Sequence, residues 1–417
     1  MVLSIREYDK LHIREKRDLT RNQISKDDAA VLQRLVIDDL PVFKWGNRCL
    51  IAQQWVGVID LPEYSIEILP KLAREIENEK CRDILTRMLL VAHQSPSTRK
   101  LPGSVNSKKN ALTEVLISAF LGALEIYIKS GVLNAYQKVQ NNIDVVKGRI
   151  VFSKQFKQNV LSPTRFYCSY SKYISDNPVN QFLATCLSQM SCISRDNDNL
   201  RRIRAAEQYF EGVQILEVRK ALNLKINFNS INSSAVESYN FGYMFLSCNF
   251  MTVNAGGIAM NVMLFDMNHL FELFMFKAIR QVYGSRVHYQ SGNNYLVHSV
   301  DSGRNYIRLR PDIAIYSDSG NYIIDTKWKM PISFAKESDI YQMNAYSTGI
   351  GKVERVFLLY PKTSGTVTFS GDYLFTTHAG GNRNLGIRTI DLELCTNWAA
   401  FLNEIKHRCT RGTNKIK

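Results

Sequence analysis

The chain has 417 residues, a length that predicts two or three domains rather than one core. Hydrophobic residues make up 45% of the chain and charged residues 22%, which excludes a disordered or fibrous protein. Lys and Arg total 53 against 38 Asp and Glu, and this net charge of +15 favours a polyanionic partner such as DNA or RNA without establishing one.

Export, membrane insertion and zinc binding all lack sequence support. The first 20 residues are charged throughout, and no run of 18 apolar residues occurs, so we expect a cytoplasmic protein with no membrane partner. The eight cysteines form no CxxC pair, and the seven histidines form no HxxxH or HExxH pattern. We therefore expect reduced, packed thiols and no zinc site.

Residues 1–110 predict a β-rich domain. Segments 42–45, 50–59 and 64–69 are rich in β-branched and aromatic residues, and turn residues separate them. Residues 27–40 have the pattern of an amphipathic helix, and the rest of the first hundred residues predicts strands with only short helices. Residues 95–110 have the composition of a loop.

Residues 111–238 predict a mainly helical region. Apolar residues recur at helical spacing over 112–133, 177–194 and 199–216, and Asn177-Pro178 is a typical helix start. Arg201, Arg202 and Arg204 cluster in the last of these segments, where a solvated helix face is favoured over a DNA contact.

Residues 239–417 predict an α/β domain. The order is a helix over 265–283, strands over 287–289, 306–316 and 322–328, a helix over 338–347, and a strand over 355–360. The fold class predicted for the whole chain is therefore a multidomain α+β or α/β protein.

Two short acidic segments in this last domain carry the strongest functional signal. Arg310-Pro311-Asp312 is followed by twelve residues and then by Asp325-Thr326-Lys327. A turn at 317–320 can fold the two segments into a hairpin that brings Asp312 near Asp325. Alternate residues of a strand share a face, so Asp325 and Lys327 point the same way.

This pattern resembles that of PD-(D/E)xK nucleases, which implies a restriction-endonuclease-like core. Two converging carboxylates suit Mg²⁺, with Mn²⁺ as a substitute, and both ions take phosphate oxygens as further ligands. A lysine beside the ion can position or help deprotonate water and stabilise charge on the phosphate. We predict phosphodiester hydrolysis by Asp312, Asp325 and Lys327, and the alternative is a surface salt bridge between Asp325 and Lys327.

Three further residues are candidates for the same site. Glu272 is a lone acid among apolar neighbours and can be a third metal ligand or an ordinary surface glutamate. Gln342 and Tyr346 lie four residues apart and share a helix face, which a generic amphipathic helix also explains. The segment 349–353 lacks the spacing of a phosphate-binding loop, so no nucleotide site is expected in this chain.

An ordered set of segments resembles the McrC family, the nuclease subunit of McrBC-type modification-dependent restriction systems. Each segment alone is a weak match, but their order along the chain is specific. The segments are Ile5-Arg6-Glu7-Tyr8, Ile66-Glu67-Ile68-Leu69-Pro70-Lys71, Val146-Lys147-Gly148-Arg149-Ile150, Asp176-Asn177-Pro178-Val179-Asn180, Leu264-Phe265-Asp266-Met267-Asn268, Leu270-Phe271-Glu272, Pro311-Asp312 and Asp325-Thr326-Lys327-Trp328-Lys329.

The resemblance implies an endonuclease subunit that restricts modified foreign DNA together with a hexameric AAA+ GTPase of the McrB type. It implies that residues 1–110 engage the partner and stimulate its GTP hydrolysis, whereas residues 239–417 cut. By position it gives the metal and catalytic roles to Asp312, Asp325 and Lys327 and the helix acid to Glu272. Gln342 and Tyr346 are similar to the Q-x-x-x-Y pair of RecB-like nucleases.

Two other interpretations stay open from the sequence. A stand-alone RecB-like repair nuclease would share the acidic site but not the segment 66–71. A noncatalytic activator of an NTPase would have no need for three converging charges.

Overall fold

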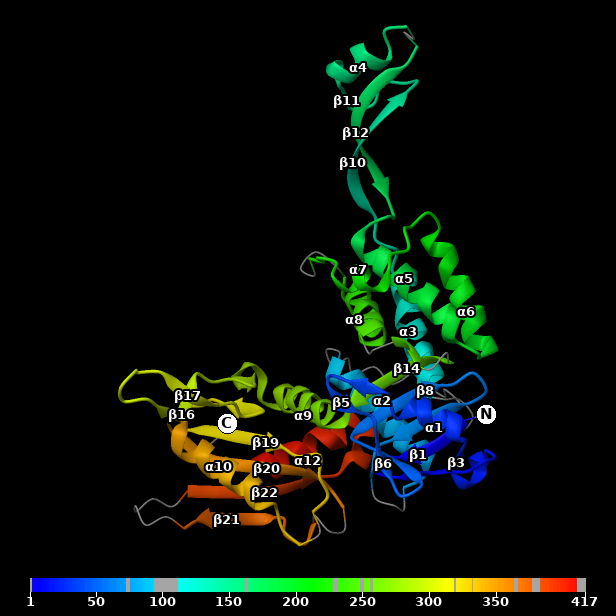
Figure 1. The fold of residues 1–417 in the computed structure, drawn as a ribbon. Helices are drawn as coiled ribbons and strands as arrows, with labels where there is room; N and C mark the ends of the chain where they lie inside the picture. The colour runs from blue at the N-terminus through cyan, green and yellow to red at the C-terminus, as the bar shows by residue number, and fades with distance from the viewer. Residues whose placement is uncertain are drawn as a thin grey trace. The chain divides into compact units, whose positions relative to one another are not determined.

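The computed structural model describes residues 2–72, 76–93, 112–161, 164–227, 232–247, 251–255, 258–318, 320–331, 333–363, 367–376 and 383–410. The chain is a mixed α/β protein with several sheets (Figure 1). It forms two compact units: one joins Met1–Val115 to Cys248–Lys417, and the other is Leu116–Ser247. The loop predicted at 95–110 lies outside the described residues.

A five-stranded sheet in the first unit combines strands that are distant in the sequence. Strands β1 and β9 are parallel, and β8 is antiparallel to both β9 and β14. Apolar side chains from these strands share one buried cluster. In order across the sheet, the strands are Val2–Arg6 (β1), Ser65–Leu69 (β9), Trp55–Asp60 (β8), Ile258–Asp266 (β14) and Met251–Ala255 (β13).

The helix predicted over 27–40 is shorter in the structure. Helix α1 spans Lys26–Leu32 and begins with a capping box between Ser25 and Asp28. The rest of the segment is a two-stranded hairpin, Val36–Ile37 (β4) and Leu40–Pro41 (β5). Its turn residues Asp38 and Asp39 have φ angles of 48° and 62°, a left-handed conformation that aspartate tolerates and that a tight hairpin turn needs.

The prediction of only short helices in the first hundred residues is wrong for α2, which spans Asn78–His93. The predicted strand region 50–59 is also two strands, β7 (Cys49–Ala52) and β8, in different sheets. Strand β7 belongs to a four-stranded sheet. Across that sheet the strands are Gln23–Ile24 (β3), Lys10–Ile13 (β2), β7 and Phe43–Gly46 (β6).

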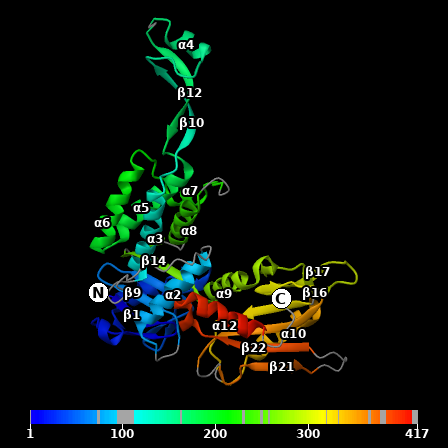
Figure 2. The ribbon, with the colours of Figure 1, turned by 180° about the vertical axis from the view of Figure 1, so that it is seen from behind.

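A six-stranded mixed sheet forms the other half of the first unit. Helix α10 (Glu337–Gly349) packs on one face, where Met343 and Tyr346 share a buried cluster with alternate residues of β20. Helix α12 (Trp398–Thr410) lies on the opposite face with α9 (Met267–Tyr283) (Figure 2). In order, the strands are Val287–Tyr289 (β15), Ile313–Ile315 (β18), Asn321–Thr326 (β19), Val353–Pro361 (β20), Arg383–Ile390 (β22) and Gly371–Phe375 (β21).

The strand predicted over 306–316 is two strands that belong to different sheets. Asn305–Leu309 (β17) pairs with Asn294–His298 (β16), whereas β18 joins the six-stranded sheet. Pro311 lies between β17 and β18 and has no N–H to donate to a strand ladder, so the continuous strand is broken there. The strand predicted over 322–328 ends at Thr326.

The second unit is helical at its base and carries a long β-hairpin. Strands Ala135–Ile143 (β10) and Phe166–Ile174 (β12) pair along nine residues each. The prediction of a mainly helical region overlooked this hairpin, because most of its side chains are at least partly exposed and leave no apolar face to recognise. The remaining elements are Leu112–Lys129 (α3), Arg149–Ile150 (β11), Phe152–Gln158 (α4), Pro178–Ile193 (α5), Asn197–Glu207 (α6), Val218–Leu222 (α7) and Ser233–Ser247 (α8).

A predicted helix cap of the second unit is present, and two arginines of the predicted cluster form ion pairs. Asn177 caps α5 by accepting hydrogen bonds from the backbone of Val179 and Asn180. In the arginine cluster, Arg201 pairs with Asp198 on its own helix. Arg202 pairs with Glu125 of α3, and its side chain is 22% exposed.

Candidate active site

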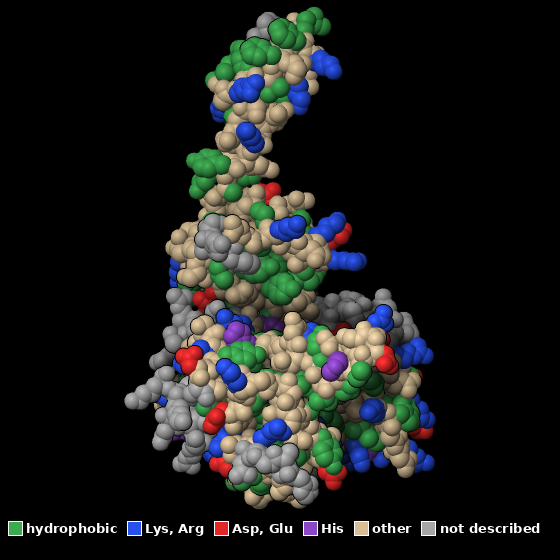
Figure 3. Space-filling view, turned by 90° about the vertical axis from the view of Figure 1, so that its left-hand side faces the viewer, with side chains coloured by type: hydrophobic (Ala, Val, Ile, Leu, Met, Phe, Trp, Pro, Cys, Tyr) green, Lys and Arg blue, Asp and Glu red, His purple; other side chains and the backbone are tan. Residues whose placement is uncertain are grey.

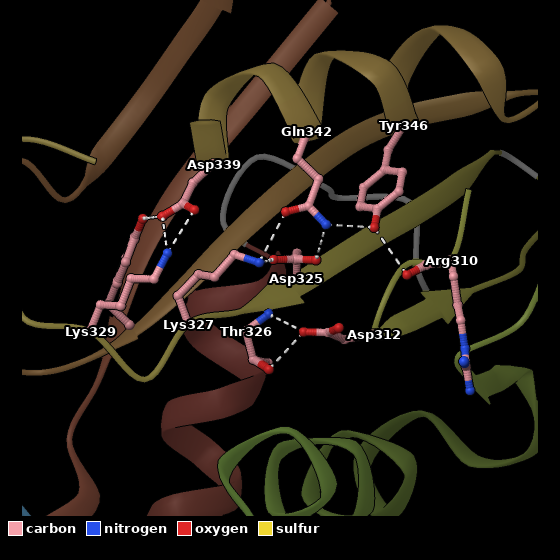
Figure 4. Close-up of polar contacts among 10 residues, drawn as sticks. Arg310, Asp312, Asp325, Thr326, Lys327, Lys329, Asp339, Gln342 and Tyr346 are labelled. Carbon is pink, nitrogen blue, oxygen red and sulfur yellow. Dashed lines mark hydrogen bonds and ion pairs between the residues drawn. The ribbon is translucent and has the colours of Figure 1, made fainter. Parts of the chain in front are cut away.

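Adjacent antiparallel strands bring the two predicted catalytic segments together. Strands β18 and β19 are paired with Ile313 opposite Ile324. Asp312, which directly precedes β18, therefore lies beside Asp325 near the end of β19 (Figure 4). The hairpin inferred from the sequence thus places both carboxylates at one end of the six-stranded sheet.

Asp325 and Lys327 form an ion pair that is almost entirely removed from solvent. The Asp325 side chain is 1% exposed and that of Lys327 is 17% exposed. Helix α10 completes the arrangement, because the Lys327 ammonium donates a hydrogen bond to Gln342 Oε1 at 3.0 Å. Gln342 Nε2 lies 3.4 Å from Asp325 Oδ1 and donates to the Tyr346 hydroxyl at 2.8 Å.

Tyr346 extends this network back to the segment that carries Asp312. Its hydroxyl donates to the backbone carbonyl of Arg310 at 3.0 Å. Gln342 and Tyr346 lie four residues apart on one face of α10, so the helix bridges the two catalytic strands. The structure therefore brings both residues of the predicted pair into the site.

The electrostatics of the ion pair keep Lys327 protonated. Burial by itself would lower the pKa of Lys327, but the Asp325 and Asp312 carboxylates outweigh burial and raise that pKa above its usual value. Burial raises the pKa of Asp325, and Lys327 opposes that shift. Lys327 is thus a cation near neutral pH, able to stabilise negative charge rather than to accept a proton.

Asp312 is held by the strand that carries Asp325. Its Oδ2 accepts hydrogen bonds from the Thr326 backbone N–H at 2.7 Å and from the Thr326 hydroxyl at 2.9 Å. Burial and the negative charges of Asp325 and Glu272 raise the pKa of Asp312 to about 7. Three carboxylates therefore act on one another within this site.

Glu272 reaches the site from α9, where it is held by Gln290, a residue that the sequence analysis did not single out. Gln290 Nε2 donates to Glu272 Oε1 at 2.6 Å. The Gln290 backbone N–H donates to the Asp312 carbonyl at 2.9 Å, and Arg310 donates to the Gln290 side chain. Gln290 thus links the helix acid to the segment before β18, but nothing in its local pattern marks it as functional.

A second buried carboxylate borders the site and was also not predicted. Asp339, in the first turn of α10, is 4% exposed. Lys329 donates to both of its oxygens at 2.9 and 3.2 Å, and the Tyr360 hydroxyl donates to Oδ2 at 3.3 Å (Figure 4). Lys329 lies two residues after Lys327 in the sequence, which was the available signal for this pair.

The donor set fits a hard divalent cation in its chemistry. Within the described residues, no group of three His, Cys, Asp or Glu side chains is close enough to hold one ion. Asp312 and Asp325 nevertheless present carboxylates side by side, and Glu272 contributes to the raised pKa of Asp312. Oxygen ligands with an excess of negative charge are what Mg²⁺ prefers.

A comparison with protein-family models identifies one family. The model of the family described as "McrBC 5-methylcytosine restriction system component" matches residues 50–361, which is more than half of the chain. No curated protein matches the chain.

Two solved structures are similar to this chain. The first is "Refined half-complex from tetradecameric assembly of Thermococcus gammatolerans McrB AAA+ hexamers with bound McrC", with a TM-score of 0.68, 14% identity, and coverage of 97% of this chain and 100% of that chain. The second is the cryo-EM structure of the Thermococcus gammatolerans McrBC complex, with a TM-score of 0.49, 16% identity, and coverage of 68% and 88%. The first likeness shows a shared fold.

Of the helices that the structure describes, none is both long and apolar enough to cross a membrane.

Proposed function

The chain belongs to the McrBC family, and from that premise we propose that it is the DNA-cutting subunit of a restriction system, a magnesium-dependent PD-(D/E)xK endonuclease. The observation that carries this proposal is the ion pair of Asp325 and Lys327 beside Asp312. A surface salt bridge would lie in solvent, whereas this pair is buried at a cost in desolvation that a structural role does not require.

Each polar residue has a distinct role in the proposed reaction. Asp312 and Asp325 would hold the ion, with Glu272 as a third acid. A bound Mg²⁺ supplies Lewis-acid stabilisation of the phosphate and lowers the pKa of bound water. Lys327 pairs with Asp325 and donates one hydrogen bond to Gln342, and its ammonium carries three N–H groups, so it can also donate to a phosphate oxygen or the attacking water.

The proposed partner is a hexameric AAA+ GTPase of the McrB type, and the proposed substrate is modified duplex DNA. The printed description of the first similar structure, in which McrB AAA+ hexamers have McrC bound, supports the choice of partner. The net charge of +15 supports DNA binding.

The partner-contact surface has two candidates. The family resemblance assigns it to residues 1–110. The β10–β12 hairpin module favours a second location, because it exposes large hydrophobic side chains at a density that typically marks a protein-binding surface (Figure 3). These side chains are Tyr136, Val145, Val146, Phe152, Phe156, Val160, Leu161 and Tyr173.

Substitution of Asp325 tests the proposed chemistry. Asp325→Asn keeps the shape of the side chain but removes a charge, so we expect cleavage of modified DNA with Mg²⁺, partner and GTP to fall by at least about a hundredfold. Asp318→Asn is the matched control, since Asp318 is exposed in the turn of the same hairpin and should cut normally. Wild-type rates for Asp325→Asn, in protein with an unchanged urea midpoint, would overturn the assignment.

The same assay separates the competing functions. Cleavage that needs no partner would indicate a stand-alone nuclease. Stimulation of GTP hydrolysis without cleavage by the wild-type chain would indicate a noncatalytic activator.

A further inference from the structure

A pocket of about 270 Å³ opens next to the catalytic strand. It lies where the two N-terminal segments singled out in the sequence, around Tyr8 and Lys71, meet the loop that follows β19. Its lining includes Tyr8, Lys71, Trp328, Lys329, Lys336 and Asp339. Trp328 directly follows Lys327, so the pocket begins roughly 4 Å along the chain from the catalytic lysine.

The wall of this pocket is fixed by a buried hydrogen-bonded contact. Glu7 is 0% exposed and accepts a hydrogen bond from the Trp328 indole N–H at 2.9 Å and another from the Lys71 backbone N–H at 2.9 Å. The Trp328 ring also lies 5.4 Å, centroid to centroid, from Phe271 of α9. A single carboxylate therefore ties both N-terminal segments to the loop beside Lys327.

The side chains that line the pocket carry a net positive charge. Three lysines and one aspartate line it, and Asp339 is engaged by Lys329 (Figure 4). In the described part of the chain, no acidic side chain forms an ion pair with Lys71 or Lys336, and both residues are exposed. Two exposed lysines without an acidic ion-pair partner thus line the pocket, an arrangement that suits a phosphate group.

An aromatic ring stands at the same opening. Tyr8 is 45% exposed, and the Lys71 ammonium lies 5.3 Å from its ring centroid. The φ angle of Tyr8 is 64°, a conformation that a large residue adopts at an energetic cost. Such strain is often retained where it presents a side chain to a ligand.

We propose that this pocket binds one unpaired nucleotide of the DNA strand close to the bond that is cut, with Lys71 and Lys336 on its phosphate and Tyr8 stacked on its base. The proposal rests on the nuclease function proposed above. The pocket is too small for a duplex but has room for a single nucleotide, and rings stack on every base without regard to sequence. Since it directly adjoins Lys327, it would hold the strand in register with the catalytic residues.

The contribution of the two lysines is tested by measuring how tightly the full chain binds a single-stranded oligonucleotide. EDTA is present, so the DNA stays intact. Lys71→Ala and Lys336→Ala should each reduce the slope of log affinity against log salt by about 0.7, and the double variant by about 1.4. Lys16→Ala is the matched control, because Lys16 is exposed but does not line the pocket, and its slope should stay at the wild-type value.

Two experiments test the role of Tyr8: the affinity of Tyr8 variants for a single strand, and a crosslink that shows whether the strand lies beside Tyr8. Tyr8→Ala should weaken single-strand binding by about 5-fold or more at unchanged slope, whereas Tyr8→Phe should bind as wild type and duplex binding should change little. An oligonucleotide carrying 5-iodouracil should photo-crosslink to the peptide that contains Tyr8. Excess dTMP should fail to prevent this crosslink, and competition by dTMP would show a free-nucleotide site instead of a strand site.

The outcomes separate the two proposals. If the wild-type chain binds and cuts DNA but the lysine variants keep the wild-type slope and Tyr8 does not crosslink, the pocket proposal is wrong and the nuclease proposal stands. If the wild-type chain neither binds nor cuts DNA with its partner present, the proposed function itself fails. Unchanged urea midpoints for all variants exclude misfolding as the cause of lost binding.

Discussion

Glu7 is a buried carboxylate whose surroundings favour its neutral form. Burial raises the pKa of Glu7 to about 8, although the hydrogen bonds from Lys71 and Trp328 oppose that shift. The nearby Asp266 adds to the increase, and the charge of Lys71 reduces it. Between about pH 4.5 and pH 8, the folded protein therefore keeps a proton on Glu7 that the unfolded chain has already released.

Glu7→Gln should remove this pH dependence. Because the folded-state pKa is raised, the contribution of wild-type Glu7 to the free energy of unfolding falls as the pH rises towards 8. Relative to wild type, Glu7→Gln should change stability little near pH 5 and should be more stable at pH 9, as measured by urea unfolding. Glu7→Ala leaves the Trp328 indole without its acceptor and should lose about 1–3 kcal/mol at pH 5, and less at pH 9, where it also removes the ionised carboxylate. An equal effect of Glu7→Gln at pH 5 and pH 9 would contradict the raised pKa.

Strands β8 and β14 join the two sequence segments of the first unit, and they approach closely at Gly57. Gly57 lies opposite Leu264 and has a φ angle of 137°. A Cβ atom at this position would lie 2.0 Å from the Met263 carbonyl oxygen. The close pairing of β8 with β14 therefore requires glycine at residue 57.

Gly57→Ala should destabilise the protein by more than about 2 kcal/mol, because a backbone clash must be relieved by separating the strands. Gly351→Ala is the matched control, since a Cβ atom added at Gly351 would meet no atom within 4 Å and its φ is not in the left-handed range. Its effect should be within about 0.5 kcal/mol. Urea unfolding of both variants measures the difference, and equal midpoints would show that β8 and β14 adjust without cost.

At the scale of the whole molecule, cutting and partner activation should be separable. Asp325→Asn should still stimulate GTP hydrolysis by the partner, because that stimulation depends on surface contacts. Phe152→Ser combined with Phe156→Ser should lose most of it, since these rings are 65% and 70% exposed and stack on one another in α4. Tyr341→Ser is the control, as Tyr341 is similarly exposed on α10 at 68%.

Steady-state GTP turnover by the partner, with each variant at saturating concentration, measures this separation. Full stimulation by the Phe152 and Phe156 double variant would return partner contact to residues 1–110, as the family resemblance implies. Loss of stimulation by folded Asp325→Asn would show that the two activities share one site.

Local features of the fold could be predicted because they are set by neighbouring residues. Asp325 and Lys327 share a face through the two-residue period of a strand, and Asn177 caps a helix through its own side chain. The hairpin between Asp312 and Asp325 spans few residues, so turn composition indicated it. Errors arose where a turn or a proline interrupted an otherwise regular pattern, as at Asp38-Asp39 and Pro311.

The sequence by itself determined the acids, the lysine and the helix pair of the candidate site, because their spacing follows from strand and helix geometry. Only the tertiary structure decided that Glu7 holds Trp328 across 321 residues of chain, and that β8 pairs with β14 although the whole second unit lies between them in the sequence. The reason is physical: periodicity reports which face of an element is buried, but it carries no information about which distant segment covers that face.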